Sequence, residues 1–118
     1  MTIMLVQERA DALKHLKQMV EECYPHCTIA AFSSAEEALA KIRKADEQID
    51  LCFTEIMMHG PSGFRIVEEL RRRNRWAKAV VIARDKDHAL EAWRVGVNDY
   101  LIEPLTMESI RHAQISCS

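Results

Sequence analysis

The feature that most constrains the fold is a regular alternation between short apolar runs and longer segments with helical periodicity. The apolar runs occupy residues 3–6, 28–32, 51–54, 79–83 and 99–102. Segments with helical periodicity lie at residues 10–22, 35–45, 63–73, 88–95 and 107–115. Strands that alternate with helices in this way form a parallel sheet that is covered by helices on both faces. The pattern therefore predicts five successive βα units.

The length and composition favour one globular domain over residues 1–118. A chain of 118 residues with 48% hydrophobic content is large enough to bury its own core. A net charge of -2 gives no overall basic field for nucleic-acid binding by this domain. We find no apolar run long enough for a signal peptide or a membrane span, so we expect a cytoplasmic protein that does not contact a membrane. Such a chain is either a small stand-alone protein or the front part of a longer one.

The cysteines do not form a pattern typical of a metal site. Cys23, Cys27, Cys52 and Cys117 lack paired Cys-x-x-Cys spacing, and we expect them to be thiols in a reducing compartment. Cys23 and Cys27 lie on either side of His26, but a structural zinc site needs four ligands. A zinc site is therefore disfavoured.

In an open parallel sheet, functional residues gather where the strands end, at their carboxyl edge. The residues expected at that edge are Gln7, Glu8, Glu55, Ala83, Arg84, Glu103 and Pro104. The chain shows no Ser-His-Asp set, Gly-rich phosphate loop or Cys-His nucleophile spacing, so other kinds of catalysis have no support.

Two segments carry a resemblance to a known family. Asp50-Leu-Cys-Phe-Thr-Glu-Ile-Met-Met58, followed by Gly60-Pro-Ser-Gly63, resembles the phosphoacceptor segment of response-regulator receiver domains. Ala89-Leu-Glu-Ala-Trp-Arg-Val-Gly-Val-Asn-Asp-Tyr-Leu-Ile-Glu-Pro104 is similar to the fourth helix, fifth strand and Lys-Pro turn of that family. Together with Leu5-Val6-Gln7-Glu8, the match covers nearly the whole chain. The resemblance implies a flavodoxin-like doubly wound α/β fold with five parallel strands in the order 2-1-3-4-5.

Two features resemble the LytTR-type subgroup of receivers. They are the short connection over residues 83–89 and the sequence motif Ala-Leu-Glu-Ala-Trp-x-Val-Gly that begins at Ala89. Members of this subgroup usually carry a DNA-binding domain after the receiver. The resemblance therefore leaves open that this domain is the N-terminal part of a transcription regulator.

Receiver chemistry transfers a phosphoryl group from a kinase to an aspartate, and Mg²⁺ neutralises the charge that develops. The resemblance implies that Glu8 is the acidic metal ligand and that Gln7 replaces its acidic neighbour. It places Glu55 where the family has the aspartate nucleophile, and it implies that the backbone carbonyl of Met57 is a further metal ligand.

The same resemblance shows further departures. Ala83 stands where the family has a hydroxyl residue, and Glu103 stands where it has a lysine. The longer side chain of Glu55 reaches into the space of an incoming phosphoryl group, and Glu103 reverses a charge that transfer needs. We therefore expect negligible phosphotransfer and no cofactor, with Mg²⁺ binding weak at most.

Glu8, Glu55 and Glu103 should converge, and like charges held together must be relieved by a cation, a raised pKa or separation. Arg84 lies on the same rim, and we expect it to turn inward to Glu55 or Glu103. For Glu55 two interpretations remain open. It is either an inert solvated carboxylate or a negative charge that imitates an aspartyl phosphate.

Tyr100 occupies the place of the family's aromatic switch residue. Two interpretations remain open: its ring is held inward beside Ala83, or it is an ordinary core or surface tyrosine. Trp93, Asp99 and Arg111 lie in the fourth helix, fifth strand and fifth helix, where receivers commonly dimerise or meet effectors. Trp93 is either a core residue or an interface hot spot.

The basic run Arg71-Arg-Arg-Asn-Arg75 is read as a solvated helix cap in preference to a nucleic-acid contact, because we expect no aromatic stacking residue beside it. His59 stands where the family usually has proline, and a lone histidine is expected to be structural.

The predicted function is an atypical receiver that is not an enzyme and acts through a protein partner or a homodimer. A sensor kinase is a further candidate partner. The alternatives are phosphorylation on a non-standard acceptor and the LytTR-type regulator described above.

Overall fold

The computed structural model describes residues 1–44 and 48–113. Strands and helices alternate along these ranges, as the sequence predicts. The strands are β1 (Thr2–Val6), β2 (Thr28–Phe32), β3 (Leu51–Glu55), β4 (Lys78–Ala83) and β5 (Asp99–Ile102). The helices are α1 (Ala10–Cys23), α2 (Ala35–Arg43), α3 (Gly63–Arg73), α4 (Ala89–Val95) and α5 (Met107–His112).

The last helix is shorter than the predicted range 107–115. Ala113 has an extended backbone and follows the final helical residue, His112. Residues 114 and 115 of the predicted helix, residue 45 of the second predicted helix and Cys117 lie outside the described residues.

The five strands are parallel and lie in the order β2-β1-β3-β4-β5, which confirms the predicted order. The pairing aligns the ends of neighbouring strands to within one residue, with Val6 opposite Thr54 and Ala83 opposite Ile102. The residues that follow β1, β3, β4 and β5 therefore meet at one edge of the sheet.

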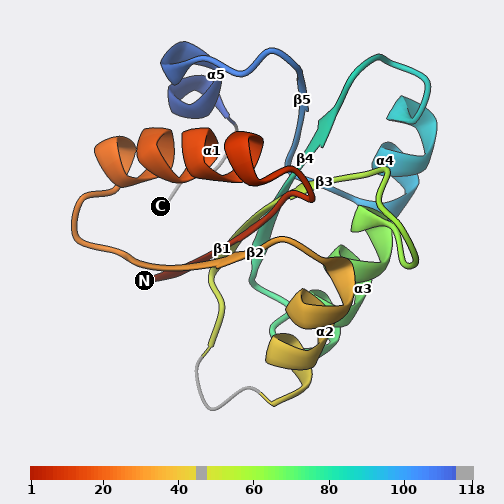
Figure 1. Cartoon of the computed structure of the whole chain (residues 1–118). Helices are drawn as coiled ribbons and strands as arrows, with labels where there is room; N and C mark the ends of the chain where they lie inside the picture. The colour runs from red at the N-terminus through yellow and green to blue at the C-terminus, as the bar shows by residue number, and fades with distance from the viewer. Residues whose placement is uncertain (45–47, 114–118) are drawn as a thin grey trace.

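Helices cover both faces of the sheet (Figure 1). Helices α1 and α5 lie together on one face, and α2, α3 and α4 lie on the other. The strand β1 shows the consequence for side chains, because Ile3 and Leu5 pack in one core while Met4 and Val6 pack in the other. All four side chains are fully buried, as expected for an interior strand whose side chains alternate between two covered faces.

The basic run at residues 71–75 does not form a uniform solvated cap. The Arg71 guanidinium donates to the carbonyls of Val95 and Gly96, and its Nη2 lies 2.9 Å from Asn98 Oδ1. The Asn98 oxygen also accepts the backbone N–H of Ala79 at 2.8 Å. Arg71 is therefore a structural residue that ties α3 to the end of α4 and the start of β4, which corrects the sequence-based interpretation for this residue.

An aromatic residue does accompany the basic run, contrary to expectation. Trp76 is 73% exposed, and the Arg75 guanidinium lies 4.8 Å from the centre of its ring. The turn that carries Trp76 is fixed by Asn74, whose side chain accepts the Trp76 N–H and donates to the Ile49 carbonyl.

Within residues 1–44 and 48–113, the helices are too short or too polar to traverse a lipid bilayer.

Candidate functional site

The predicted acidic residues meet at the carboxyl edge of the sheet. Glu8 follows β1, Glu55 ends β3 and Glu103 follows β5, and all three line one cavity of about 430 Å³. The same cavity is lined by Ala83 at the end of β4 and by the exposed side chain of Met57. The structure thus brings most of the residues expected at this edge around one cavity, whereas Gln7 and Pro104 line a second cavity with Glu55, Arg84 and Glu103.

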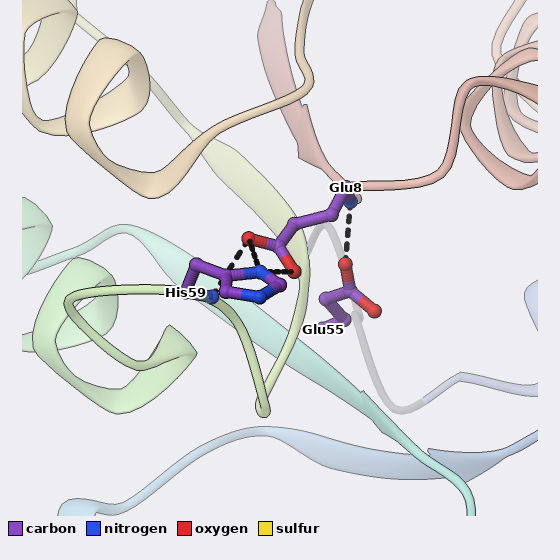
Figure 2. A network of polar contacts seen from close by, with 3 residues as sticks. All are labelled: Glu8, Glu55 and His59. Carbon is purple, nitrogen blue, oxygen red and sulfur yellow. Dashed lines mark hydrogen bonds and ion pairs between the residues drawn. The ribbon is translucent and has the colours of Figure 1, made fainter.

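Hydrogen bonds connect the loops that carry these carboxylates (Figure 2). Glu55 Oε1 accepts the backbone N–H of Glu8. The Glu8 carboxylate in turn accepts the backbone N–H of His59 at 2.7 Å, and it lies 3.1 Å from His59 Nδ1. The β1–α1 loop is therefore joined to the end of β3 through the Glu55 side chain and to the β3–α3 loop through the Glu8 side chain.

These contacts separate the acidities of the two carboxyl groups. The backbone N–H of His59 lowers the pKa of Glu8 below its ordinary value, and this effect outweighs desolvation. Partial burial raises the pKa of Glu55, and the charges of Glu8 and Glu103 add to the increase, whereas Arg84 and the Glu8 N–H oppose it. Glu8 is thus the carboxyl that holds its charge most readily, and Glu55 is the one that protonates more easily.

His59 was not recognised from the sequence as part of this site. Its strongest contact uses a backbone N–H, which every residue except proline provides, so the residue type gives little signal. The available clue was its position, because the family usually has proline there and proline has no N–H to donate.

Arg84 does not take the predicted place. It lines the cavity, but its side chain is exposed, and the ion pairs found in the described part of the chain do not include it. An exposed arginine stays hydrated and keeps the conformational freedom of its side chain. An ion pair at the rim would reduce both and would contribute little free energy in return. Among the described residues Arg84 forms no ion pair with Glu55 or Glu103, although it lines the cavity with both and its charge opposes the rise in the Glu55 pKa.

The β3–α3 loop is held close to the end of β3 by Gly63. The Gly63 N–H donates to the Ile56 carbonyl at 2.9 Å. A Cβ atom at residue 63 would lie only 2.1 Å from the Glu55 carbonyl oxygen. Glycine therefore allows the first turn of α3 to approach the backbone that carries Glu55.

Tyr100 packs inward without being fully buried. Its half-buried ring lies against the core cluster that contains Ala83 and Ala92. Its hydroxyl donates to the Asp85 carbonyl at 2.7 Å. The ring is thus connected to the β4–α4 loop, as the inward alternative requires.

The three interface candidates differ in exposure. Trp93 is 78% exposed, which excludes the alternative that it is a core residue. Arg111 is exposed on α5, whereas Asp99 is half-buried and its side chain accepts the Tyr100 N–H at 2.8 Å.

The residues at this edge do not fit a magnesium ion. Mg²⁺ requires near-octahedral oxygen ligands, usually including carboxylates that are free to bind it. Here the Glu8 carboxylate is turned to the backbone N–H and ring of His59, and Glu55 contacts the backbone N–H of Glu8, so the two carboxylates are not directed at a shared ion (Figure 2). In the described ranges no three His, Cys, Asp or Glu side chains are arranged to hold a metal ion.

Comparisons with known proteins agree with this architecture. The family model of the response regulator receiver domain matches residues 3–114. The alginate biosynthesis transcriptional regulatory protein AlgB of Pseudomonas aeruginosa is 26% identical over 94% of this chain and 24% of its own length. The sensory transduction protein LytT of Enterococcus faecalis is 26% identical over 93% of this chain and 45% of its own length. The chain therefore spans less than half the length of these relatives.

Solved structures show the same fold. A two-component response regulator from Clostridium difficile superposes with a TM-score of 0.79 at 28% identity, covering 93% of this chain and 88% of that one. A receiver domain protein from Clostridium thermocellum gives a TM-score of 0.81 at 22% identity, covering 95% and 89%. The similarity to LytT also agrees with the LytTR-type resemblance. With the strand order and the family match over residues 3–114 in agreement, the chain belongs to the response regulator receiver domain family.

Proposed function

We propose that this receiver signals through protein contacts without accepting a phosphoryl group at Glu55. The observation that supports this most strongly is the pair of hydrogen bonds that connect Glu55 to Glu8 and Glu8 to His59. One oxygen of Glu55 and the carboxylate of Glu8 already accept backbone N–H groups of the protein itself, so the protein orients both side chains.

The surrounding positions support the same proposal. Ala83 offers a methyl group where a phosphoryl oxygen would need a hydroxyl donor. Glu103 lines the cavity as a second carboxylate, where transfer of a dianion calls for a fixed cation. This domain therefore has no phosphotransfer activity in the proposal, and it is not an enzyme.

Intact-mass spectrometry tests the absence of phosphotransfer. Incubation with Mg²⁺ and acetyl phosphate should leave the mass unchanged. The matched variant Glu55→Asp/Ala83→Thr/Glu103→Lys supplies the nucleophile, hydroxyl and cation that transfer requires, and it should gain a phosphate adduct. A stoichiometric, hydroxylamine-sensitive adduct on the unaltered protein would disprove the proposal and support the alternative of a non-standard acceptor.

The proposed contact surface is the face formed by α4, β5 and α5. Trp93 and Leu90 on α4 are 78% and 61% exposed, and Ile102 on β5 is also exposed. Exposed aromatic and aliphatic side chains gathered on neighbouring elements are typical of protein interfaces, and tryptophan and arginine are frequent hot spots. Arg111 on α5 supplies an exposed guanidinium.

Light scattering tests this surface through the mass of the protein in solution. If the domain forms a homodimer here, Trp93→Ala and Arg111→Ala should shift the equilibrium toward monomer. Trp76→Ala is a matched control, because it removes an equally exposed tryptophan outside this face. If the partner is another protein, the same variants should weaken its binding in a pull-down. A monomeric domain whose partner binding ignores Trp93 and Arg111 contradicts this surface.

We further propose that the domain serves as the receiver part of a transcription regulator that responds to a sensor kinase or another protein partner. The names and greater length of AlgB and LytT support this. Reading the gene downstream of the codon for Ser118 tests it, since a LytTR-type DNA-binding domain should follow. A stop codon at that point contradicts it.

A further inference from the structure

We infer that an arginine surface on α2 and α3 binds an acidic segment of a protein partner. This arginine surface consists of five exposed arginines and one exposed tryptophan: Arg43, Arg65, Arg72, Arg73, Arg75 and Trp76. None of these residues lines either cavity at the carboxyl edge of the sheet, and none belongs to α4, β5 or α5. The inference therefore goes beyond the proposed function, because it assigns a second contact surface.

The first supporting observation is an excess of positive charge around one carboxylate. Arg65, Arg72 and Arg43 lie 3.4, 3.2 and 3.9 Å from the same oxygen, Oε1 of Glu69. Arg65 and Arg72 are on α3 with Glu69, whereas Arg43 ends α2. Three guanidinium groups from two helices thus share a single carboxylate.

Other carboxylates in the described part of the chain do not offset this excess. Arg73 and Arg75 form no ion pair within residues 1–44 and 48–113. Glu68, the other acidic residue of α3, lines the cavity between α3 and α4 together with Arg94. In these ranges the five positive charges of the arginine surface are therefore paired with one negative charge.

The guanidinium groups remain available to a partner. The side chains of Arg43, Arg65 and Arg72 are 52%, 51% and 65% exposed. Each guanidinium presents five N–H donors in a planar fork that matches a carboxylate, and the contact with one oxygen of Glu69 leaves most of these donors unused. Carboxylates from a partner would complete this arrangement.

The stability of α3 does not account for the cluster. Arg65 lies in the first turn of α3, where the helix dipole disfavours a positive charge. It also precedes Glu69 by four residues, which is the less favourable order for an ion pair along a helix. Guanidinium groups around one carboxylate repel one another, and an added negative charge relieves that repulsion.

The second observation is independent of charge and concerns Trp76. It is 73% exposed, and the Arg75 guanidinium lies 4.8 Å from the centre of its ring. Asn74 fixes the turn by accepting the Trp76 N–H at 3.1 Å and donating to the Ile49 carbonyl at 3.0 Å. An exposed tryptophan on a fixed turn beside arginines is typical of an interface hot spot, and a partner that contacts it loses little conformational entropy.

An acidic polypeptide fits this surface better than a nucleic acid or a membrane. The net charge of -2 repels a long polyanion, whereas a short acidic segment contacts the arginines alone. Base stacking needs free aromatic faces, and Arg75 covers one face of the Trp76 ring. A lipid surface requires a broad apolar face, and Trp76 is the one large apolar side chain of the arginine surface.

Isothermal titration calorimetry tests the surface. The probe is the capped peptide Glu-Asp-Leu-Glu-Asp-Leu-Glu, and its matched control is Gln-Asn-Leu-Gln-Asn-Leu-Gln, which has nearly the same shape without the charge. The acidic peptide should bind at least tenfold more tightly than the control. In the variant Trp93→Phe, where Trp76 is the only tryptophan, the acidic peptide should also shift the emission maximum to shorter wavelength. Equal binding of the two peptides, or an unchanged emission maximum, would overturn the inference.

Two double variants separate this surface from general electrostatics. Arg65→Gln/Arg72→Gln removes two charges of the cluster and should weaken the acidic peptide at least tenfold. Lys14→Gln/Lys17→Gln removes the same charge from exposed positions on α1, which covers the other face of the sheet, and it should leave binding within twofold. Equal weakening by both double variants contradicts a specific surface.

Circular dichroism verifies that each variant is folded. If Arg65→Gln/Arg72→Gln is not, Arg73→Gln/Arg75→Gln replaces it, because these two arginines form no ion pair in the described ranges. This variant should weaken the acidic peptide at least fivefold, and unchanged binding would contradict the inference.

Single-stranded DNA of ten thymidines gives a further outcome. If it binds more tightly than the acidic peptide, the surface recognises nucleic acid and the inference is wrong. Failure of the acidic peptide to bind also overturns the inference, but it leaves the proposed function standing. The intact mass with acetyl phosphate and the variants of Trp93 and Arg111 test that function separately.

Discussion

Gly63 shows how one residue without a side chain positions the acidic edge. The backbone of α3 begins so close to the end of β3 that an added Cβ would overlap the Glu55 carbonyl oxygen. Backbone atoms in a sheet cannot move aside as a flexible side chain can, so any larger residue must push α3 away from β3.

Gly63→Ala should therefore lower the free energy of unfolding by about 1–3 kcal/mol, a range typical of overpacking. Chemical denaturation followed by circular dichroism measures the change. Ser62→Ala is the matched control, because Ser62 precedes α3 without capping it through its side chain, and we expect less than about 0.5 kcal/mol. Equal stability of the Gly63→Ala variant and the unaltered protein would show that the loop yields easily.

Glu55 gives the domain a pH dependence whose direction follows from its raised pKa. A carboxyl group with a higher pKa in the folded state stabilises the fold below its ordinary pKa of 4.5, and this contribution is lost as the pH rises through the higher value. Glu55→Gln removes the charge but keeps an oxygen that can accept the Glu8 N–H. The variant should be more stable at pH 7, by about 0.5 kcal/mol because Glu55 is only half-buried and solvent screens its charge.

Thermal unfolding between pH 4 and pH 8 measures this difference. The advantage of Glu55→Gln should shrink toward pH 4, where both side chains are neutral. Glu21→Gln, at an exposed position, should track the unaltered protein across the range. A Glu55→Gln variant that is less stable at pH 7 contradicts the pKa direction.

At the scale of elements, the connection between α3 and α4 depends on Arg71. Its guanidinium bonds the last carbonyls of α4, at Val95 and Gly96, and also bonds Asn98 before β5. Because α4 is a short helix with one buried residue, Ala92, this connection contributes much of what holds it in place.

Arg71→Met keeps an unbranched apolar stem but removes the guanidinium and its donors, and it should destabilise the fold by about 2 kcal/mol. Hydrogen exchange should become faster in α4 before it changes in the central strands. Arg73→Met alters a neighbouring exposed arginine and should have little effect on either measurement. Unchanged exchange in α4 would show that Arg71 contributes little to its position.

At the scale of the whole molecule, the two tryptophans lie outside the core. Trp76 and Trp93 are 73% and 78% exposed. Their fluorescence should resemble that of tryptophan in water, and its emission maximum should shift little on unfolding, whereas circular dichroism changes fully. In the variant Trp76→Phe, the tryptophan fluorescence comes from Trp93 alone. A partner that docks on α4 should then shift the emission maximum to shorter wavelength. A large shift on unfolding without a partner would contradict the exposed positions.

The arrangement of helices and strands was predictable because strands that are buried on both faces consist almost entirely of apolar residues. Residues 3–6 and 79–83 are continuous apolar runs because both sides of each strand are covered. The direction of a side chain in a loop does not produce a comparable sequence pattern. The sequence places Arg84 beside the acidic residues, but whether it turns inward depends on hydration and freedom that spacing does not encode. The role of His59 was also hidden, because the contact uses its backbone.

The bond from the Glu8 N–H to Glu55 has a consequence for how such a domain evolves. Changing Glu55 to aspartate shortens the side chain by one methylene and withdraws the acceptor that the Glu8 N–H uses. The stability of the fold would fall with this substitution, and Ala83 and Glu103 would still prevent phosphotransfer. The change at Glu55 alone is thus expected to lower stability without restoring phosphotransfer.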